Sequence, residues 1–354
     1  MNARIVIGAN YGDEGKGTVV ASYTKKTNNV LNILTNGGAQ RGHSILTNDG
    51  NITFHHFGSG TYHGADTFYS KYFILNPIQF VNEYNSLIIK PKHIFRDIKC
   101  KWSTPYDIMA NIIEEEQRNR HCSCYMGIWK TIKRYNELYN ISLDDFVLHN
   151  KLTYLQDIKT YYEKILNIPS DWKSIWNSPN MITNFYNDCK FMVNNTVTCN
   201  LSDLNYDNLI FENGQGLLLC DTGKDTYDTT PSNTGIKYSL ELISELPNID
   251  NITASYVTRP YLTRHGDGYL FNENNKSFIS THIEEDRTNH YNDGQGKFRY
   301  GELNINELNN RIKQDLNNSN IKFELEVTHC DEMDRINEFK KIFNNVNTYD
   351  TPLV

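Results

Sequence analysis

Six consecutive residues near the start of the chain combine glycines with two acids and a lysine: Gly12-Asp13-Glu14-Gly15-Lys16-Gly17. Glycines let backbone N–H groups approach phosphate oxygens, and the N-terminus of a following helix adds a favourable dipole. A lysine in such a loop can bridge phosphates during their transfer. The pattern predicts a phosphate-binding loop in which Gly12, Glu14, Gly15, Gly17 and Thr18 contact a nucleotide and Lys16 takes part in chemistry.

This loop differs from the standard G-x-x-x-x-G-K-[ST] phosphate loop at two positions. Asn10 occupies the place of the first glycine, and Gly17 replaces the Ser or Thr that would hold magnesium. The metal ligand must therefore come from another residue. Asp13 is the candidate, because a hard divalent cation that bridges phosphate oxygens prefers carboxylate and carbonyl oxygens.

Two further loops carry polar groups after glycines. In Gly37-Gly38-Ala39-Gln40-Arg41-Gly42-His43-Ser44, the imidazole of His43 can donate a hydrogen bond to a phosphoryl oxygen. In the segment that starts at Phe211-Glu212-Asn213-Gly214-Gln215-Gly216, the carboxamide of Gln215 can recognise an amide-like base edge. Thr230, Ser232 and Asn233 follow with hydroxyl and amide groups for a phosphate or sugar.

Short apolar runs precede these loops. They predict strands whose ends hold the loops in position. They are Arg4–Gly8, Val30–Leu34, Leu209–Phe211, Ile252–Val257 and Phe323–Val327, with a helix over Thr18–Lys26. In open α/β sheets, ligands gather outside the carboxyl ends of the strands. The loops Asn10–Gly17, Asn36–His43, Glu212–Asn233 and Thr328–Asp334 are therefore expected to form one composite site.

These elements predict an α/β fold with a large, mostly parallel central sheet and flanking helices. A mainly helical insertion is expected over about residues 105–200, because Asp107–Leu166 carries a helical pattern. No repeat, Pro-rich linker or charge block marks a domain boundary. We therefore expect one elaborated domain over residues 1–354.

Composition narrows the class of protein. The formal net charge is -7, so the chain has no general attraction for nucleic acid, and phosphate binding must come from local groups. No run of about 18 apolar residues is present, and none of the seven cysteines forms a C-x-x-C pair. We expect a cytoplasmic protein with reduced thiols, without a membrane or nucleic-acid partner.

The loops resemble those of the adenylosuccinate synthetase family. The family's motifs are WGDEGKGK, GGxNAGHT and FEGAQGTLL followed by SSN. This chain has YGDEGKGT, GGAQRGHS and FENGQGLLL followed by PSN, in the same order. The likeness spans about residues 4–334 and implies the family's phosphate-loop fold, with a nucleoside triphosphate and Mg²⁺ as co-substrate and cofactor.

In this family, GTP phosphorylates the 6-oxygen of IMP, and the amine of aspartate then displaces the phosphate. The resemblance implies that Asp13 takes the N1 proton and binds Mg²⁺ together with the carbonyl of Gly42. Lys16 and His43 would stabilise the transferring phosphoryl group, and Gln215 would orient the intermediate. The positions matching nucleotide contacts are Gln40, Ser123, Arg134, Leu219, Thr230 and Arg264.

The resemblance is weaker around aspartate and the triphosphate base. The family segment GTTTGRxRR appears as Asp293-Gly294-Gln295-Gly296-Lys297-Phe298-Arg299, which leaves Lys297 and Arg299 as candidate aspartate ligands. The guanine-reading TKLD appears as Thr328-His329-Cys330-Asp331. His329 and Asp331 would contact the triphosphate base, and GTP, ATP and dATP all remain open.

Two acceptor nucleotides are possible, a guanine nucleotide or IMP. Gln40 replaces the family's asparagine and Arg41 the following alanine, and the chain is short for a bacterial member. These departures favour the viral 2-aminoadenylosuccinate synthetase branch, which uses (d)GMP and would place the protein in a host cytoplasm. Retention of Asp13 favours the IMP-using enzyme, because many viral members lack that aspartate.

The same residues leave two alternatives to a ligase function, and the resemblance also implies a partner subunit. A nucleotide-binding regulatory protein without ligase activity is one rival, and a phosphate-loop nucleotide kinase is the other. Asp13, Lys16, His43 and Gln215 together favour the ligase, since binding alone requires neither a base nor a phosphoryl-stabilising group. Family members are usually homodimers with an arginine that reaches the neighbouring site, and Arg134 is the nearest candidate.

Overall fold

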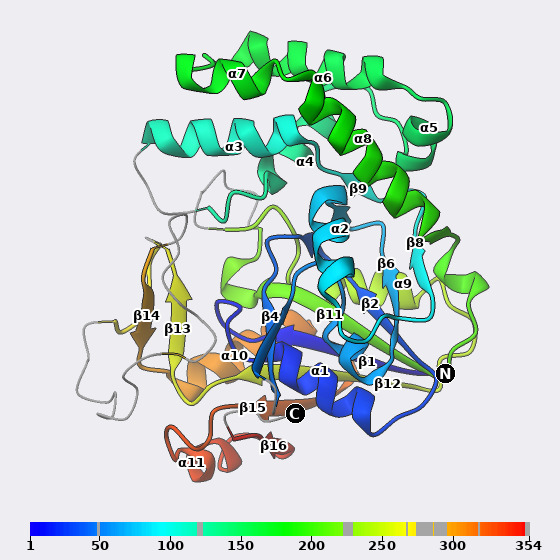
Figure 1. Ribbon diagram of the computed structural model, residues 1–354. Coiled ribbons are helices and arrows are strands. Elements are labelled where there is room, and N and C mark those ends of the chain that lie inside the picture. The colour runs from blue at the N-terminus through cyan, green and yellow to red at the C-terminus, as the bar shows by residue number, and fades with distance from the viewer. Residues whose placement is uncertain are drawn as a thin grey trace.

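The computed structural model describes residues 1–47, 50–118, 123–221, 229–266, 268–273, 286, 296–317 and 319–350. Within them, nine strands form one sheet whose neighbouring pairs all run parallel (Figure 1). In spatial order these are β10 (Val197–Thr198), β8 (Ile94–Arg96), β6 (Asp66–Tyr69), β2 (Val30–Leu34), β11 (Asn208–Gly216), β1 (Asn2–Gly8), β12 (Asn251–Thr258), β15 (Lys322–Val327) and β16 (Val346–Thr348). The predicted α/β fold with a mostly parallel sheet is confirmed.

The central strands are apolar because both faces of a parallel sheet are covered. All five residues of β2 are buried, and Ile5, Val6 and Ile7 of β1 have no exposed surface. All five predicted strands lie within β1, β2, β11, β12 and β15. The helix predicted at Thr18–Lys26 is α1 (Lys16–Lys25), which starts directly after the first loop.

One predicted boundary is wrong. The loop expected from Glu212 onward begins only after Gly216, because β11 continues to that residue and pairs with β1 there, with a register shift between Val6 and Gly8. The strand can carry Glu212 because its buried carboxylate finds hydrogen-bond donors. A short 3-10 helix, η4 (Leu217–Leu219), follows β11.

Three smaller sheets accompany the nine-stranded sheet in the described part of the chain. A parallel sheet contains β3 (Gly37–Gly38), β7 (Phe73–Leu75) and β9 (Lys101–Trp102). Two antiparallel pairs are β4 (His43–Thr47) with β5 (Gly50–Phe54), and β13 (Leu262–His265) with β14 (Phe298–Gly301). The second predicted loop therefore contains β3, and His43 begins β4.

Helices gather beyond one side of the sheet, at the top of Figure 1. They are α3 (Pro105–Arg118), α4 (Ile128–Glu137), α5 (Leu143–Leu148), α6 (Leu152–Ile165), α7 (Lys173–Trp176) and α8 (Pro179–Asn194). The start of α8 shows why the chain turns helical there: Ser178 accepts a hydrogen bond from the N–H of Met181, and Pro179 occupies the first turn. The assignment of about residues 105–200 as an insertion into one domain stays a prediction.

The remaining helices flank the sheet. They are α2 (Pro77–Ser86), α9 (Lys237–Ile243), α10 (Ile305–Leu316) and α11 (Ile336–Lys340). No helix in the described ranges is long and apolar enough to cross a membrane.

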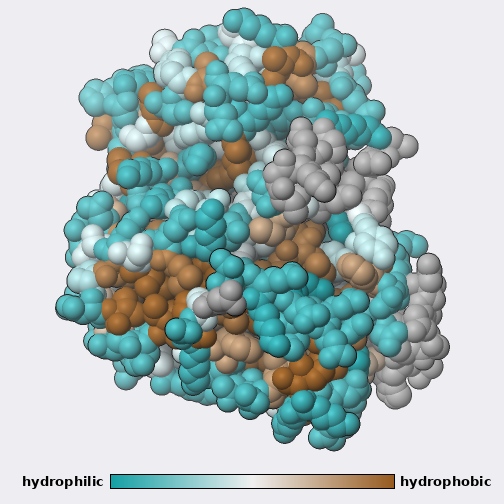
Figure 2. All heavy atoms as spheres, turned by 180° about the vertical axis from the view of Figure 1, so that it is seen from behind, coloured by the Kyte–Doolittle hydropathy of each residue, from teal (hydrophilic) through white to brown (hydrophobic). Residues whose placement is uncertain are grey.

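The apolar core is divided between the sheet and the helical layer. One buried cluster joins β1, β2 and β15 with α10, for example through Ile7, Leu31 and Ile312. Another joins α2 to the helical layer and includes Trp102 and Trp176. Seen from behind, the upper helical part is mostly hydrophilic, and hydrophobic surface gathers in separate areas of the lower part (Figure 2). The helical layer thus has its own packing while resting on the carboxyl edge of the sheet.

Candidate active site

The strand-end loops meet at one edge of the sheet because β11, β1, β12 and β15 are parallel neighbours. A Cβ atom placed on Gly12 would lie 2.9 Å from Cα of Gln215, so the first loop packs directly on the end of β11. On the other side, Oγ1 of Thr328 donates a hydrogen bond to the carbonyl of Glu14 at 2.6 Å. The structure thus brings the first, third and fourth loops into contact.

The first loop is shaped by two glycines and a buried acid. Gly12 and Gly15 have φ angles of 112° and 86°, a region that glycine adopts without strain. Oε1 of Glu14 accepts hydrogen bonds from the N–H groups of Asn10 at 2.9 Å and Gly12 at 2.8 Å. The Glu14 side chain, only 2% exposed, therefore holds the backbone of the loop in its conformation.

Lys16 is fully buried at the start of α1. Its Nζ atom donates to the carbonyl of Gly12 at 2.6 Å and lies 3.6 Å from Oε2 of Glu14. Burial lowers the pKa of Lys16 and raises that of Glu14, and their mutual attraction opposes both shifts. A bound phosphate would supply the negative charge that keeps the ammonium protonated. Oγ1 of Thr18 is also buried, and no described residue bonds to it.

Asp13 differs from its neighbours because its carboxylate is only half-buried. None of the residues that the structure describes donates a hydrogen bond to that carboxylate, and the backbone carbonyl of Asp13 accepts one from Nε of Arg259 at 2.8 Å. The charges of Asp13 and Lys16 are close enough to interact. The loop backbone is thus held by a buried arginine while the acid stays available.

Asp13 and Gly42 carry oxygens of the type that a hard cation prefers. Gly42 is exposed in the second loop, and both its carbonyl and the Asp13 carboxylate offer oxygen ligands. In the described part of the chain, no three His, Cys, Asp or Glu side chains gather into a metal-binding group. Mg²⁺ is usually bound through one or two protein oxygens together with substrate phosphates, and Asp13 and Gly42 carry oxygens of that kind.

His43 is held by a buried carboxylate from β11. Its Nδ1 atom lies 2.5 Å from Oε1 of Glu212, which also accepts from Oγ of Ser59 at 2.7 Å. The other carboxylate oxygen accepts from the N–H of Ser59 at 3.0 Å. Burial lowers the pKa of His43 to about 3, so the ring is neutral, and Nδ1 carries the proton that it donates to Glu212.

Glu212 remains charged although it is buried. Burial by itself raises the pKa of Glu212, but the nearby Arg41 guanidinium and the hydrogen bonds from His43 and Ser59 lower it to about 2. Lys16 is also within electrostatic range of both His43 and Glu212. Lysine, imidazole and carboxylate therefore surround one small region beside the first loop.

Two carboxamides face the same region around Gly37. A Cβ on Gly37 would lie 3.2 Å from Nε2 of Gln40 and 3.3 Å from Oε1 of Gln215. Both side-chain polar atoms of Gln40 and Oε1 of Gln215 are buried without a partner among the described residues. Gln215 has a φ of 56°, an unusual conformation for a residue with a side chain. Buried, unpaired amides at a strained position are typical of a ligand site.

The structure places the other predicted nucleotide contacts on three different segments. Arg264 of β13 stacks over the ring of Tyr11, with its guanidinium carbon 4.9 Å from the ring centroid. The N–H of Thr230 donates to the carbonyl of Leu219 at 2.8 Å. This places both residues in one turn after β11, of which residues 222–228 lie outside the described residues. Ser123 lies before α4, and its Oγ donates to Oδ1 of Asn111 at 3.0 Å.

The helical layer reaches the second loop through α4. A Cβ on Gly38 would lie 2.8 Å from Cδ1 of Ile128 and 2.8 Å from the carbonyl oxygen of Ile74, so a larger residue would collide with backbone there. Nε1 of Trp129 donates to the carbonyl of Thr229 at 3.3 Å. The layer therefore bounds the site opposite the sheet.

The two candidate aspartate ligands differ in their exposure to solvent. Lys297 is exposed. Arg299 donates to Oε2 of Glu273 at 2.7 Å and to the carbonyls of Gly266 and Gly268. It pairs in register with Arg264 across β13 and β14, so both arginines belong to one ribbon. The start of this predicted segment, Asp293 to Gln295, lies outside the described residues.

The two predicted residues of the fourth loop differ in burial. His329 is buried with a φ of 55°, and its Nδ1 lies 2.9 Å from Oγ1 of Thr328. Asp331 is exposed. Thr328 also packs 3.2 Å from the position of a Cβ on Gly15, which ties this loop to the phosphate loop.

Arg134 is not brought to the site. Its guanidinium has no exposed surface, and Nε and Nη2 bind the carboxylate of Asp107 at 2.8 and 3.0 Å. It also donates to the hydroxyl of Tyr154 and the carbonyl of Trp102. In this structure Arg134 joins helices within the helical layer and cannot extend toward another subunit.

Sequence reasoning missed the buried residues behind the site, above all Glu212, Ser59 and Arg259. Glu212 carried one usable signal, because an acid that directly follows the apolar run Leu209–Phe211 must be buried and therefore paired. Ser59 and Arg259 lie far from their partners in sequence, so no local pattern indicates which group each of them contacts.

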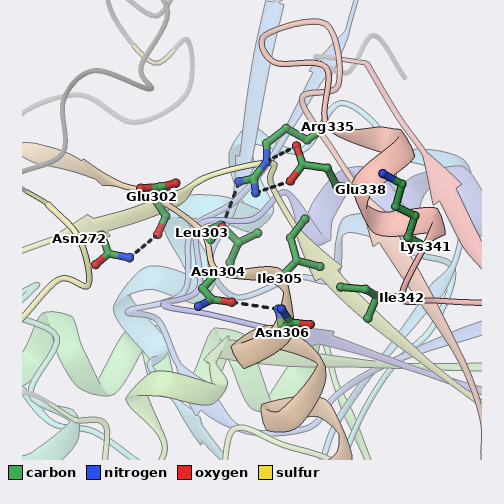
Figure 3. Close-up of a pocket in the computed structure, with 10 residues that line it drawn as sticks. All are labelled: Asn272, Glu302, Leu303, Asn304, Ile305, Asn306, Arg335, Glu338, Lys341 and Ile342. Carbon is green, nitrogen blue, oxygen red and sulfur yellow. Dashed lines mark hydrogen bonds and ion pairs between the residues drawn. The ribbon is translucent and has the colours of Figure 1, made fainter.

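A separate pocket of about 550 Å³ lies where α10 and α11 begin (Figure 3). None of the predicted site residues lines it. Arg335 bonds to Glu338 and to the carbonyl of Leu303, and Asn304 caps α10. The predicted site residues lie in the strand-end region instead, which remains the candidate site.

Comparisons with known proteins agree with this geometry. Residues 5–344 match the sequence pattern of the adenylosuccinate synthetase family. The adenylosuccinate synthetase of Buchnera aphidicola subsp. Baizongia pistaciae is 25% identical over 282 residues, which cover 75% of this chain and 63% of that enzyme. The enzyme of Dehalococcoides mccartyi strain 195 is 27% identical over 169 residues, or 45% of this chain and 40% of its own length. The chain thus spans less than two thirds of these relatives.

Two solved structures share the fold. Adenylosuccinate synthetase from Plasmodium falciparum, solved fully ligated, superposes with a TM-score of 0.70 at 19% identity, covering 95% of this chain and 78% of that one. Succinoaminodeoxyadenylate synthetase of cyanophage S-2L, solved with dGMP and dATP, superposes with a TM-score of 0.65 at 10% identity. The match covers 99% of this chain and 93% of that one. Because the family pattern extends over nearly the whole sequence, this chain belongs to the adenylosuccinate synthetase family.

Proposed function

We propose that this protein is a ligase that joins L-aspartate to C6 of a 6-oxopurine nucleoside monophosphate and hydrolyses a nucleoside triphosphate. The observation that carries the proposal is the convergence of Asp13, Lys16, His43 and Gln215 on one edge of the sheet. A carboxylate, an ammonium and an imidazole there can serve a single phosphoryl transfer.

Each group has a distinct role in this proposal. The Asp13 carboxylate, to which no described residue donates a hydrogen bond, takes the N1 proton as the purine 6-oxygen attacks the terminal phosphate. Lys16 and His43 stabilise charge on the phosphoryl group, and Gln215 orients the 6-phosphorylated purine. The amine of aspartate then attacks C6, and inorganic phosphate leaves.

The carboxylate of Asp13 and the carbonyl of Gly42 would hold Mg²⁺. When bound, the ion neutralises charge on the triphosphate during transfer. The buried Glu14 holds the backbone of this loop in shape by accepting the N–H groups of Asn10 and Gly12.

The remaining assignments surround these groups. Gly12, Glu14, Gly15, Gly17 and Thr18 would shape the phosphate site. Ser123, Leu219, Thr230 and Arg264 would lie along the monophosphate, Lys297 and Arg299 near aspartate, and His329 and Asp331 near the triphosphate base. Arg299 would have to exchange its bond to Glu273 for the substrate carboxylate.

For the acceptor, we favour a guanine nucleotide, GMP or dGMP, which would give (2'-deoxy) 2-aminoadenylosuccinate. Guanine carries a 2-amino donor that hypoxanthine lacks. Oε1 of Gln40 and Oε1 of Gln215 are buried acceptors without a partner among the described residues, so they suit an added donor. The cyanophage enzyme with the same fold was solved with dGMP and dATP. The alternative is IMP, with a role in AMP synthesis.

A matrix of substrates tests the proposal. IMP, GMP and dGMP are each combined with GTP, ATP and dATP in the presence of Mg²⁺, and phosphate release is followed with and without aspartate. Release that requires both aspartate and a purine monophosphate is expected. Triphosphate binding without turnover would instead support a regulatory protein. Formation of a nucleoside diphosphate from the monophosphate without aspartate would support a kinase.

We also propose a homodimer. Light scattering at several protein concentrations tests this, with a mass near twice 41.1 kDa expected.

A further inference from the structure

Arg41 is a buried arginine two residues before His43. The residue is 2% exposed. Its Nη2 atom lies 3.1 Å from Oε1 of Glu212 and 2.9 Å from Nδ1 of His43. At 2.5 Å from the carboxylate, Nδ1 must itself be a donor to Glu212, so Arg41 also directs its N–H to that carboxylate. One buried acid is therefore shared by an imidazole and a guanidinium.

Space for Arg41 comes from Gly214 in β11. A Cβ on Gly214 would lie 3.2 Å from Cγ and 3.3 Å from Cδ of Arg41, closer than ordinary packing allows. Arg41 stands where GGxNAGHT has alanine, and Gly214 stands where FEGAQG has alanine. A larger residue in one loop is thus matched by a smaller residue in the facing strand, as close packing requires.

The charge of Arg41 matters because the substrate group is anionic. The carboxylate of Glu212 is completely buried directly behind His43, where it would repel an incoming phosphoryl group. A guanidinium 3.1 Å away offsets that charge. Nε and Nη1 of Arg41 have no hydrogen-bond partner in the described ranges, although Glu83 and Tyr69 lie within electrostatic range and the Phe73 ring centroid lies 5.9 Å away. The contact with Glu212 is therefore its principal one.

We propose that Arg41 is a positioning residue of the ligase reaction: it balances the charge of Glu212 and holds this carboxylate against His43, so that the imidazole faces the transferring phosphoryl group. This inference rests on the proposed function. It adds to the catalytic groups a buried residue that acts through Glu212 and His43, and it assigns Gly214 as the position that admits it.

Four variants separate this role from simple packing: Arg41→Ala, Arg41→Lys, Gly214→Ala and the double variant Arg41→Ala/Gly214→Ala. Arg41→Ala is expected to lower kcat by about 10- to 100-fold through misplacement of His43. KM for both nucleotides should stay within about threefold, since ground-state contacts are unchanged. Arg41→Lys keeps the charge and should regain part of kcat.

The double variant is decisive. Gly214→Ala alone should lower the melting temperature because its Cβ meets both Arg41 and the carbonyl of Asn36. The double variant should relieve the clash with Arg41 while kcat stays low. Recovery of wild-type kcat together with the melting temperature would show that Arg41 only fills space, and would overturn the inference. If wild-type protein shows no aspartate-dependent turnover, the proposed function fails instead.

A spectroscopic measurement tests the positioning without any turnover. The Nδ1 proton between His43 and Glu212 should give a far-downfield proton resonance that is protected from solvent exchange. The resonance is assigned to this proton if it disappears in His43→Gln. Broadening or loss of the signal in Arg41→Ala supports the proposal, and an unchanged signal in a folded Arg41→Ala protein refutes it.

Discussion

Nδ1 of His43 and Oε1 of Glu212 lie 2.5 Å apart, although 169 residues separate them in sequence. The carboxylate lies behind the imidazole and accepts the hydrogen bond from Nδ1, so Nε2 is the ring nitrogen left for a phosphoryl group. In a neutral ring, that second nitrogen is an acceptor. His43 can donate to a phosphoryl oxygen only when an anionic substrate stabilises the protonated ring.

Replacement of Glu212 by glutamine should remove both orientation and charge balance. Arg41 would remain buried without its counter-charge, and loss of one partner of a buried ion pair costs about 3–5 kcal/mol. Urea unfolding followed by circular dichroism measures this cost. Glu245→Gln is the matched control, since its ion pair with Lys71 is largely exposed and contributes about 1 kcal/mol or less. Equal stability losses in the two variants would contradict the buried pair.

Asp13→Asn should reduce turnover by about 100-fold or more, because it removes the proposed base and a metal ligand together. Phosphate release in the presence of aspartate and the best nucleotide pair measures the effect. Folding should be unaffected, since no described residue donates to this carboxylate. Asp171→Asn, at an exposed position, serves as control. Near-native turnover of Asp13→Asn would remove Asp13 from the mechanism.

Gly15→Ala should weaken triphosphate binding. Its φ of 86° is unfavourable for alanine, and the new Cβ would lie 3.2 Å from Thr328. Gly64→Ala provides a matched control, because Gly64 has a φ of 81° and open space around it. Both variants should lose about 1–2 kcal/mol of stability from backbone strain. Only Gly15→Ala should bind the triphosphate more weakly by calorimetry, and equal affinities would refute a phosphate role for this loop.

Arg134→Leu should destabilise the helical layer, because Asp107 would be left charged and buried at a cost of about 3–5 kcal/mol. Chemical unfolding measures the loss. Lys133→Ala, an exposed neighbour, should change stability by less than about 0.5 kcal/mol. If Arg134→Leu instead folds with normal stability and only raises KM for the monophosphate, Arg134 acts in nucleotide binding as the resemblance implies.

Stability should fall in mild acid because of buried histidines. Burial lowers the pKa of His56 from 6.5 to about 3, and its Nε2 accepts the N–H of Asn76 at 2.8 Å. Below pH 6.5 the unfolded chain binds a proton that the folded protein excludes until about pH 3, so this contribution to stability is lost as the pH falls through that window. Urea unfolding at a series of pH values should show a shallower decline for His56→Gln, which keeps an acceptor for Asn76. An identical decline would show that His56 does not titrate in this way.

The sequence by itself determined the chemistry-bearing loops and the strands before them. Runs such as Val30–Leu34 are so apolar that only a buried strand accommodates them, and the glycines around Lys16 allow backbone shapes that few other residues adopt. Once those strands are parallel neighbours, their carboxyl ends share one edge, so the meeting of Lys16 and His43 could be predicted.

Only the tertiary structure decided which groups support that site. Glu212 serves His43, Arg41 fits beside Gly214, and Arg134 is enclosed with Asp107 instead of reaching the nucleotide. Each of these relationships depends on which distant segments pack together and on the need to pair every buried charge. Local sequence patterns carry information about backbone shape and hydrophobic burial, whereas the partner of a buried charge is set by contacts across the whole fold.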